Sequence, residues 1–162
     1  MRILGSGEDV EVWIDENQAL FNAGNIRVVS RLIDGVFPEY RAIVPKNFEA
    51  TSIIQKNEIK DSIRTSGIFS SKLQDVTLGF HESHIEVFSQ SQDIGEYRTK
   101  IPSVFSGTPL TVGFNYRYVL DGLNALHEEE VFFGCNNENA PALLRNKDDN
   151  SFLYVVMPIR IS

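Results

Sequence analysis

The chain closes with the stretch Leu153-Tyr154-Val155-Val156-Met157-Pro158-Ile159-Arg160-Ile161-Ser162, which is apolar, rich in β-branched residues and almost uncharged. Such residues favour strands, so the pattern predicts a closing strand over 152–161 that is tied into a sheet. Pro158 has no amide hydrogen to donate, so ladder pairing is expected to stop or to shift to a sheet edge there. Met157 and Ile159 are then expected to face something other than the core.

Two similar successions of strands and helices precede this end. The first predicts a strand over 51–54, a helix from Lys56 to about Ser71, and strands over 75–80, 84–88 and 95–101. The second predicts a strand over 110–114, a helix capped by Asn115 and ending near His127, and strands over 131–135, 142–145 and 152–161. The order indicates an α+β domain. Two helices pack on antiparallel sheets, with a strand-helix-three-strand duplication that shows no obvious sequence repetition.

The N-terminal region predicts only a few strands, over 10–14, 18–21 and 26–32. Two or three strands leave both sheet edges open and do not make a stable domain alone. A linker over 34–40 contains the rigid Pro38, and 41–45 is predicted to be a short strand. This opening therefore reads as the end of a preceding domain.

Composition limits the class of protein. The 162 residues suit one ordinary domain with an appendage, and no apolar run is long enough to span a membrane. A single cysteine, Cys135, excludes an internal disulfide and reads as a small buried thiol, which favours a reduced cytoplasmic setting. The net charge of −7 argues against a wholesale basic coat for nucleic acid, although a local basic surface remains compatible with it.

No set of residues predicts catalysis. His81 and His84 are three apart, and on a strand or turn they are expected to face opposite ways, as two surface histidines rather than a metal site. The 128–130 glutamates read as a solvated helix end, and the 146–151 segment reads as a hairpin turn without the glycine and distal glutamate of a calcium loop. The sequence therefore predicts no enzyme, no cofactor and no bound metal.

Two features of the first predicted helix stand out. Lys56, Lys60 and Arg64 recur every four residues and form one basic stripe, which by itself is typical of a solvated helix face, while Glu58 and Asp61 fall on other faces. Ile59 and Ile63 mark the core side. Further along the chain, Ile68 and Phe69 lie off the core direction, and they are candidates for an exposed apolar patch.

Three ordered segments carry a family resemblance. Ser30-Arg31-Leu32-Ile33-Asp34-Gly35-Val36-Phe37-Pro38-Glu39-Tyr40-Arg41 resembles the segment that joins the second and third domains of the bacterial DNA polymerase III beta subunit, the sliding clamp. Val112-Gly113-Phe114-Asn115-Tyr116-Arg117-Tyr118-Val119-Leu120-Asp121 resembles the entry into its last helix, and Tyr154-Val155-Val156-Met157-Pro158-Ile159-Arg160 resembles its C-terminus. The resemblance covers essentially the whole chain. It implies that 1–34 are the last strands of an incomplete second clamp domain and that 35–162 are the third, C-terminal domain.

The family's function is topological and not enzymatic. Its members resemble one another in closing as head-to-tail homodimers around double-stranded DNA, with helices lining the hole. They are opened by a clamp loader, and they tether DNA polymerase and other clamp-binding proteins. Carried over, the DNA-facing residues here are Lys56, Lys60, Arg64 and Arg117. A few basic side chains on inner helices suit sequence-independent attraction to phosphates.

The resemblance also implies two protein-binding surfaces. Client peptides are expected in a pocket whose third-domain wall is Pro38, Ile43, Asn139, Pro141, Val155, Val156, Met157, Pro158, Ile159 and Arg160. Family members often carry a second arginine where this chain has Ala42, which removes one polar contact. Ile68 and Phe69 match the family's apolar pair at the dimer interface, and the alternative is that they pack on a neighbouring loop.

Two expectations depend on the missing parts of the family pattern. The first domain and most of the second are absent from this sequence, so it is expected to be a fragment or a truncated reading frame. The other pocket wall belongs to the second domain, which predicts weakened peptide binding. The alternative is a stand-alone small protein-binding module derived from a clamp domain.

Overall fold

The computed structural model describes residues 9–37 and 39–160, and the chain divides into two compact units between Glu39 and Tyr40. The first unit contains an antiparallel sheet with the order β1-β2-β3, formed by Glu11–Ile14, Gln18–Ala23 and Ile26–Arg31. A turn at Gly24, whose φ of 55° suits glycine, joins β2 to β3. The strands predicted for the N-terminal region are therefore confirmed.

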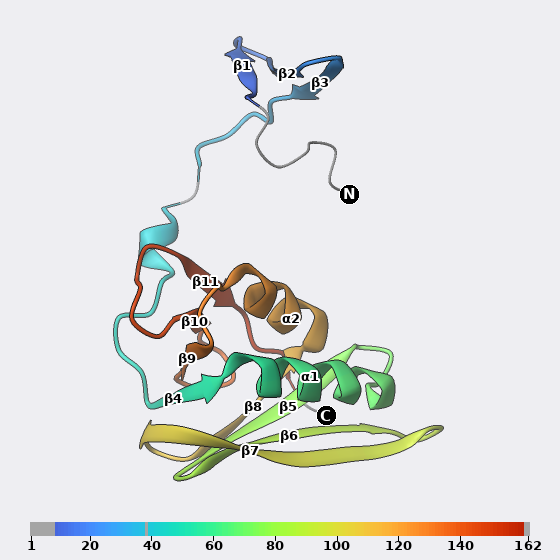
Figure 1. Cartoon of the computed structure of the whole chain (residues 1–162), viewed down its shortest axis with the longest axis vertical. Helices are drawn as coiled ribbons and strands as arrows, with labels where there is room; N and C mark the ends of the chain where they lie inside the picture. The colour runs from blue at the N-terminus through green and yellow to red at the C-terminus, as the bar shows by residue number, and fades with distance from the viewer. Residues whose placement is uncertain (1–8, 38, 161–162) are drawn as a thin grey trace. The chain divides into compact units, whose positions relative to one another are not determined.

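The second unit, from Tyr40 onward, carries the duplicated pattern (Figure 1). Its first half runs β4 (Ala50–Gln55), α1 (Lys56–Ser66), η2 (Gly67–Phe69), β5 (Asp75–His81), β6 (His84–Ser91) and β7 (Gly95–Gly107). Its second half runs β8 (Leu110–Asn115), α2 (Tyr116–Ala125), β9 (Glu130–Cys135), β10 (Ala142–Asn146) and β11 (Leu153–Val156). The predicted α+β class and the strand-helix-three-strand duplication are confirmed.

The two halves share one antiparallel sheet of eight strands in the order β11-β10-β9-β4-β7-β6-β5-β8. Each three-strand meander pairs with the first strand of the other half, because β4 lies beside β9 and β8 lies beside β5. The halves differ at the opposite edge of each meander. β7 pairs with β4 from Ala50↔Gly107 to Ile54↔Ser103, whereas the equivalent pairing of the second half, up to Arg160, is a single bridge, Gly113↔Ile159.

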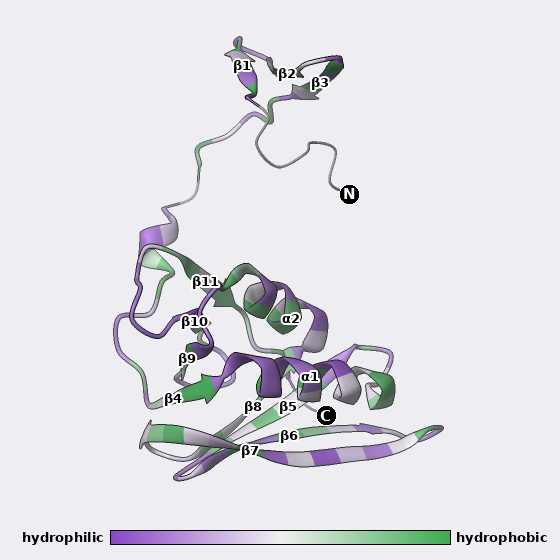
Figure 2. Cartoon of the chain, viewed as in Figure 1, coloured by the Kyte–Doolittle hydropathy of each residue, from purple (hydrophilic) through white to green (hydrophobic). Residues whose placement is uncertain are grey.

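The core lies between the sheet and the two helices, which lie side by side (Figure 1). Ile59 and Ile63 of α1 are fully buried, as their spacing predicted, and Leu123 of α2 is buried with them. Figure 2 shows the contrast along α1, where hydrophilic residues interrupt the apolar ones. Asn115 caps α2 as predicted, since its Oδ1 accepts a hydrogen bond from the Arg117 amide at 3.0 Å.

Three predicted boundaries differ from the structure. Residues 41–45 are not a strand, because the Ile43 and Val44 amides both donate to the Tyr40 carbonyl and close the 3-10 turn η1 (Tyr40–Ala42). The first helix ends at Ser66 and tightens into η2 rather than continuing to Ser71. The closing strand stops at Val156, two residues before Pro158. Within the described residues, no helix has the length and apolarity to cross a membrane.

Candidate functional site

An apolar groove of about 380 Å³ lies between helix α2 and the C-terminal segment. Its lining residues are Tyr118, Tyr154, Val155, Val156, Met157, Pro158 and Ile159. Tyr118 belongs to α2, Tyr154 to Val156 belong to β11, and the last three follow the end of that strand. The groove therefore lies between helix α2 and the end of the last strand of the sheet.

The groove exists because β11 leaves its ladder early. Leu143↔Val155 and Ala142↔Val156 are the final pairs with β10. Beyond them, the Ile159 amide donates to the Gly113 carbonyl at 2.8 Å, which is the one ladder contact with β8 that this segment makes as far as Arg160. The side chains between these two attachments are consequently not drawn into the core, and Met157 is 54% exposed.

A glycine on α2 lets the wall of the groove approach the helix. A Cβ placed on Gly122 would lie 2.6 Å from Cδ1 of Tyr154, so the tyrosine ring rests directly on the helix backbone. Burial of this ring, with Asp121 and Tyr118 nearby, raises the pKa of the Tyr154 hydroxyl. The groove therefore holds a neutral aromatic wall at physiological pH, which suits an apolar ligand.

The structure brings together half of the predicted peptide-binding residues. Val155, Val156, Met157, Pro158 and Ile159 line the groove. Ile43, Asn139, Pro141 and Arg160 are not among the groove's lining residues, and Pro38 lies outside the described residues. Ile43 is 51% exposed after η1, and the Asn139 amide is held by the Asn137 side chain at 2.9 Å in the turn before β10. These residues stay predictions for a wider pocket.

The groove also contains two residues that the sequence prediction did not include, Tyr118 and Tyr154. Tyr118 lies on α2 next to the buried Val119, and its side chain is 58% exposed. The sequence signal that could have identified Tyr118 is a large aromatic residue outside the apolar stripe of its helix. It was not decisive because the contact with β11 spans more than thirty positions of sequence.

The predicted basic stripe is only partly available to a ligand. The Lys56 ammonium donates to the Leu126 carbonyl at the end of α2 at 3.1 Å, which places a positive charge at a helix C-terminus. Arg64 forms an exposed ion pair with Asp61 at 3.1 Å. Asp61 was predicted to fall on another face of the helix, but this contact brings its carboxylate beside the basic stripe. Lys60 has no ion pair among the described residues.

The fourth predicted DNA-facing residue lies on the other helix. Arg117 is exposed at the start of α2, and its guanidinium donates to the Tyr116 hydroxyl at 3.3 Å, an interaction that raises the arginine pKa. Because α1 and α2 lie side by side, Lys60, Arg64 and Arg117 belong to one helical layer. Glu58, Asp61 and Asp121 are exposed on the same two helices, so the charge of this layer is mixed.

The predicted apolar pair divides into one exposed and one packed residue. Ile68 is 63% exposed in η2, as expected. Phe69 is half-buried because its ring stacks on Tyr97 of β7, with a centroid separation of 6.0 Å and an interplanar angle of 17°. The expectation of an exposed pair is therefore wrong for Phe69, which is covered by a strand rather than by a loop.

The histidines do not face opposite ways, as the sequence interpretation expected. His81 and His84 are directly opposite each other across the β5–β6 hairpin, and their rings stack with centroids 4.8 Å apart. The turn between them contains only Glu82 and Ser83, which returns the second histidine to the face of the first. No group of three or more His, Cys, Asp or Glu side chains within 9–37 and 39–160 is arranged to hold a metal ion.

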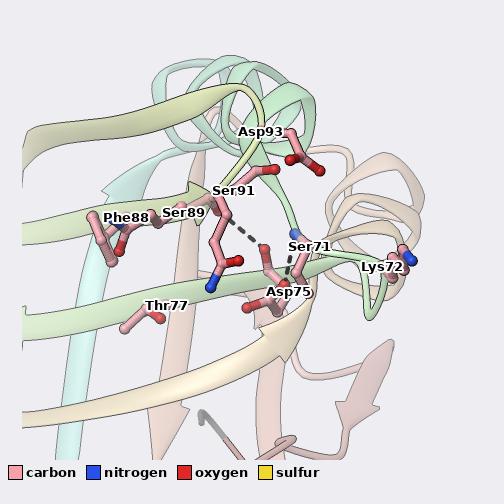
Figure 3. A pocket seen from close by; sticks show the side chains of 10 residues that line it. Ser71, Lys72, Asp75, Thr77, Phe88, Ser89, Ser91 and Asp93 are labelled. Atoms are coloured by element: carbon pink, nitrogen blue, oxygen red, sulfur yellow. Dashed lines mark hydrogen bonds between the residues drawn. The ribbon is translucent and has the colours of Figure 1, made fainter.

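A separate pocket of about 430 Å³ beside β5 and β6 is polar (Figure 3). Asp75 in this pocket is engaged, since its carboxylate accepts from the Ser71 amide at 3.0 Å and its backbone oxygen accepts from the Ser89 hydroxyl at 3.0 Å. Cys135 is buried in β9, and burial raises its thiol pKa far above the ordinary value. Neither feature supplies an activated nucleophile.

Fold and groove define the class of protein as a duplicated α+β domain of the clamp type. Among solved structures, the sliding clamp from Bartonella birtlesii bound to griselimycin is 27% identical with a TM-score of 0.83, and the match covers 94% of this chain and 41% of that one. Among curated proteins, the beta sliding clamp of Vibrio cholerae is 33% identical over 82% of this chain and 36% of its own length. That of Staphylococcus epidermidis is 30% identical over 96% of this chain and 42% of its own length.

The family assignment follows from the sequence as well. Residues 41–160 match the family described as the DNA polymerase III beta subunit, C-terminal domain. The chain belongs to the DNA polymerase III beta subunit family, as its three ordered motifs predicted. It spans roughly two fifths of the length of the curated relatives it matches.

Proposed function

We propose that this chain is the C-terminal portion of a cytoplasmic DNA sliding clamp, a non-catalytic processivity factor that docks client proteins and faces duplex DNA. In this assignment, 1–34 are the last strands of the second clamp domain and 35–162 are the third domain. The observation that carries the proposal is the apolar groove between α2 and the segment after β11. Family membership and the similarity to beta sliding clamps support it.

The groove suits a short apolar peptide. Tyr118 and Tyr154 offer flat aromatic surface, and Met157 is an adaptable apolar side chain at the rim. A volume of about 380 Å³ accommodates a few side chains rather than a folded domain. Arg160 is exposed and follows Ile159 in the chain, and its guanidinium is the group expected to donate to a peptide carbonyl or carboxylate beyond the apolar part.

Fluorescence anisotropy with a labelled peptide from the clamp-binding segment of a bacterial replicative DNA polymerase tests this role. Tyr118→Ala is expected to weaken binding by about 2 kcal/mol, which is about thirty-fold in Kd, because it removes an aromatic wall. Leu73→Ala is the matched control, since Leu73 is also a largely exposed apolar residue but does not line the groove. Equal binding by wild type and Tyr118→Ala would contradict the proposal.

The helical layer supports the second half of the proposal. Lys60, Arg64 and Arg117 present positive charge on neighbouring helices, while the chain as a whole carries a net charge of −7. Because exposed acidic residues share these helices, the attraction for phosphate is weak, which suits a protein that slides rather than reads sequence. Lys56 contributes charge from the same helix, although its ammonium is held by the Leu126 carbonyl.

The salt dependence of binding to duplex DNA tests this surface. Lys60→Ala is expected to reduce the slope of log K against log salt by about 1, equally for unrelated DNA sequences. Lys46→Ala is the control, because Lys46 is exposed in the loop before β4 and not on either helix. If both variants change the slope alike, the attraction belongs to the chain's overall charge and not to the helical layer.

Ring closure is the remaining part of the proposal. Ile68 is exposed in η2 and Phe69 is braced by Tyr97, an arrangement that would present one apolar side chain to the first domain of a partner subunit. A clamp loader and further clamp-binding proteins are the other expected partners.

A further inference from the structure

The β5–β6 hairpin ends in a pair of histidines at the point where the strands turn. His81 is the last residue of β5, His84 is the first of β6, and the two are register partners. Their rings stack at 4.8 Å between centroids with an angle of 25° between planes. Directly opposed residues of an antiparallel pair have Cβ atoms about 5 Å apart, so both imidazoles rise from one face at close range.

The surroundings leave these rings open on one side. A Cβ on Gly79 would lie 2.8 Å from Nε2 of His81, so the glycine is what allows this imidazole to lie over β5. On the other side, His84 Nδ1 is 3.4 Å from the Ser83 hydroxyl. A pocket of about 340 Å³ is lined by His81, Glu82, Ser83, His84 and Pro109. Both rings are therefore reachable from solvent.

Several charged side chains lie around His84. Partial burial, then Lys100 and the neighbouring histidine, lower the pKa of His84 against the opposing effect of Glu86. Glu86 is held by Arg98 in an ion pair on the same face.

We propose that His81 and His84 form a two-histidine site for a divalent transition-metal ion, of the class that includes Zn²⁺, Ni²⁺ and Cu²⁺. Imidazole nitrogen suits these ions, whereas Mg²⁺ and Ca²⁺ require oxygen ligands. Ring nitrogens bind zinc at a Zn–N distance of about 2.0–2.1 Å. Rotation about the side-chain bonds of the two histidines would bring one nitrogen of each ring to this distance from a shared ion. With no third protein ligand in the described residues, water completes the coordination and the ion stays exchangeable. Bound metal would join the two strands across their turn.

Titration calorimetry of the whole chain with ZnCl₂ and NiCl₂ tests the site. Wild type is expected to bind one ion at the pair, and His81→Asn or His84→Asn is expected to weaken binding by about 100-fold, because chelation by a second linked ligand is lost. His127→Asn is the matched control, since His127 is the third of the chain's three histidines and is exposed after α2. MgCl₂ is expected to give no binding at this site.

Nuclear magnetic resonance of the histidine rings keeps the test independent of the variants' folding. In wild type, Zn²⁺ is expected to shift the ring signals of His81 and His84 together and to leave those of His127 unchanged. The proposal is overturned by an absence of saturable binding, by equal shifts at all three histidines, or by an effect of His127→Asn as large as that of His84→Asn.

Discussion

Replacing Gly122 by alanine tests how the groove wall is built. The new methyl group would lie 2.6, 2.8 and 3.0 Å from Cδ1, Cε1 and Cγ of Tyr154, so the ring has to move away from α2. Overpacking of this kind costs about 2 kcal/mol. Alanine in a helix interior gains about 1 kcal/mol over glycine. Gly122→Ala is therefore expected to lower the free energy of unfolding by the difference, about 1 kcal/mol.

A second substitution reverses the sign. In a Tyr154→Ala background the obstructing ring is absent, so Gly122→Ala keeps only the helix-propensity gain and is expected to raise stability by about 1 kcal/mol. The two effects differ by a coupling energy of about 2 kcal/mol, which a double-mutant cycle measures directly. Gly122→Ala is also expected to weaken peptide binding, because the displaced ring is a wall of the groove.

Urea unfolding followed by the helical circular dichroism signal is the appropriate assay, because both described α-helices belong to the second unit. Fluorescence of the single tryptophan, Trp13, reports on β1 in the first unit instead. Asn124→Ala provides a control on the same helix, since Asn124 is exposed. The reasoning is refuted if Gly122→Ala is equally stabilising with and without the Tyr154 ring.

Three further substitutions have expected effects on thermal or urea unfolding. Asn115→Ala removes the cap that accepts the Arg117 amide and is expected to destabilise by about 1 kcal/mol, whereas unchanged stability would show the cap to be unnecessary. Gln74→Gly is expected to stabilise by about 1 kcal/mol, because Gln74 has a φ of 59° that favours glycine, and a loss of stability would mean that its side chain matters more than its backbone. Ser52→Ala is expected to stabilise by about 1 kcal/mol, since the buried Ser52 hydroxyl has no hydrogen-bond partner among the described residues, and destabilisation would point to a bond that the fold makes in solution.

The pattern of the second unit could be predicted because its signals are local. Ile59 and Ile63 stand one helical turn apart, Asn115 precedes a helix, and Pro158 interrupts a strand. Each of these features acts on residues within a few positions, and the structure confirms all three. The strand expected over 41–45 does not form, because the Ile43 and Val44 amides donate locally to the Tyr40 carbonyl.

The site could be predicted only in its C-terminal part. The residues of that segment stand together in sequence, whereas Tyr118 reaches the groove from another element. The expectation that Phe69 is exposed was wrong because its ring packs on Tyr97, which belongs to a strand far along the sequence. Helical periodicity around Phe69 does not reveal that contact. The facing of His81 and His84 depends on the length of the turn, which periodicity does not specify. Tertiary contacts also decide which basic side chains are already hydrogen-bonded within the protein. Lys56 at the start of α1, for example, donates to the Leu126 carbonyl at the end of α2.

The single described bridge between β8 and the segment after β11 separates the contacts that stabilise the fold from the residues of the proposed binding groove. In the first half, Ser103 to Gly107 of β7 pair with β4 in a continuous ladder, and their side chains alternate between the two faces of the sheet. In the second half, the described part of the equivalent segment is attached through one backbone hydrogen bond at Ile159, which does not depend on the identity of the side chains around it. Substitutions at Met157 are therefore expected to change the proposed peptide binding while the rest of the domain keeps its stability. The two halves share one order of strands and helix, but the second half leaves the side chains after β11 less constrained by strand pairing than their counterparts in the first.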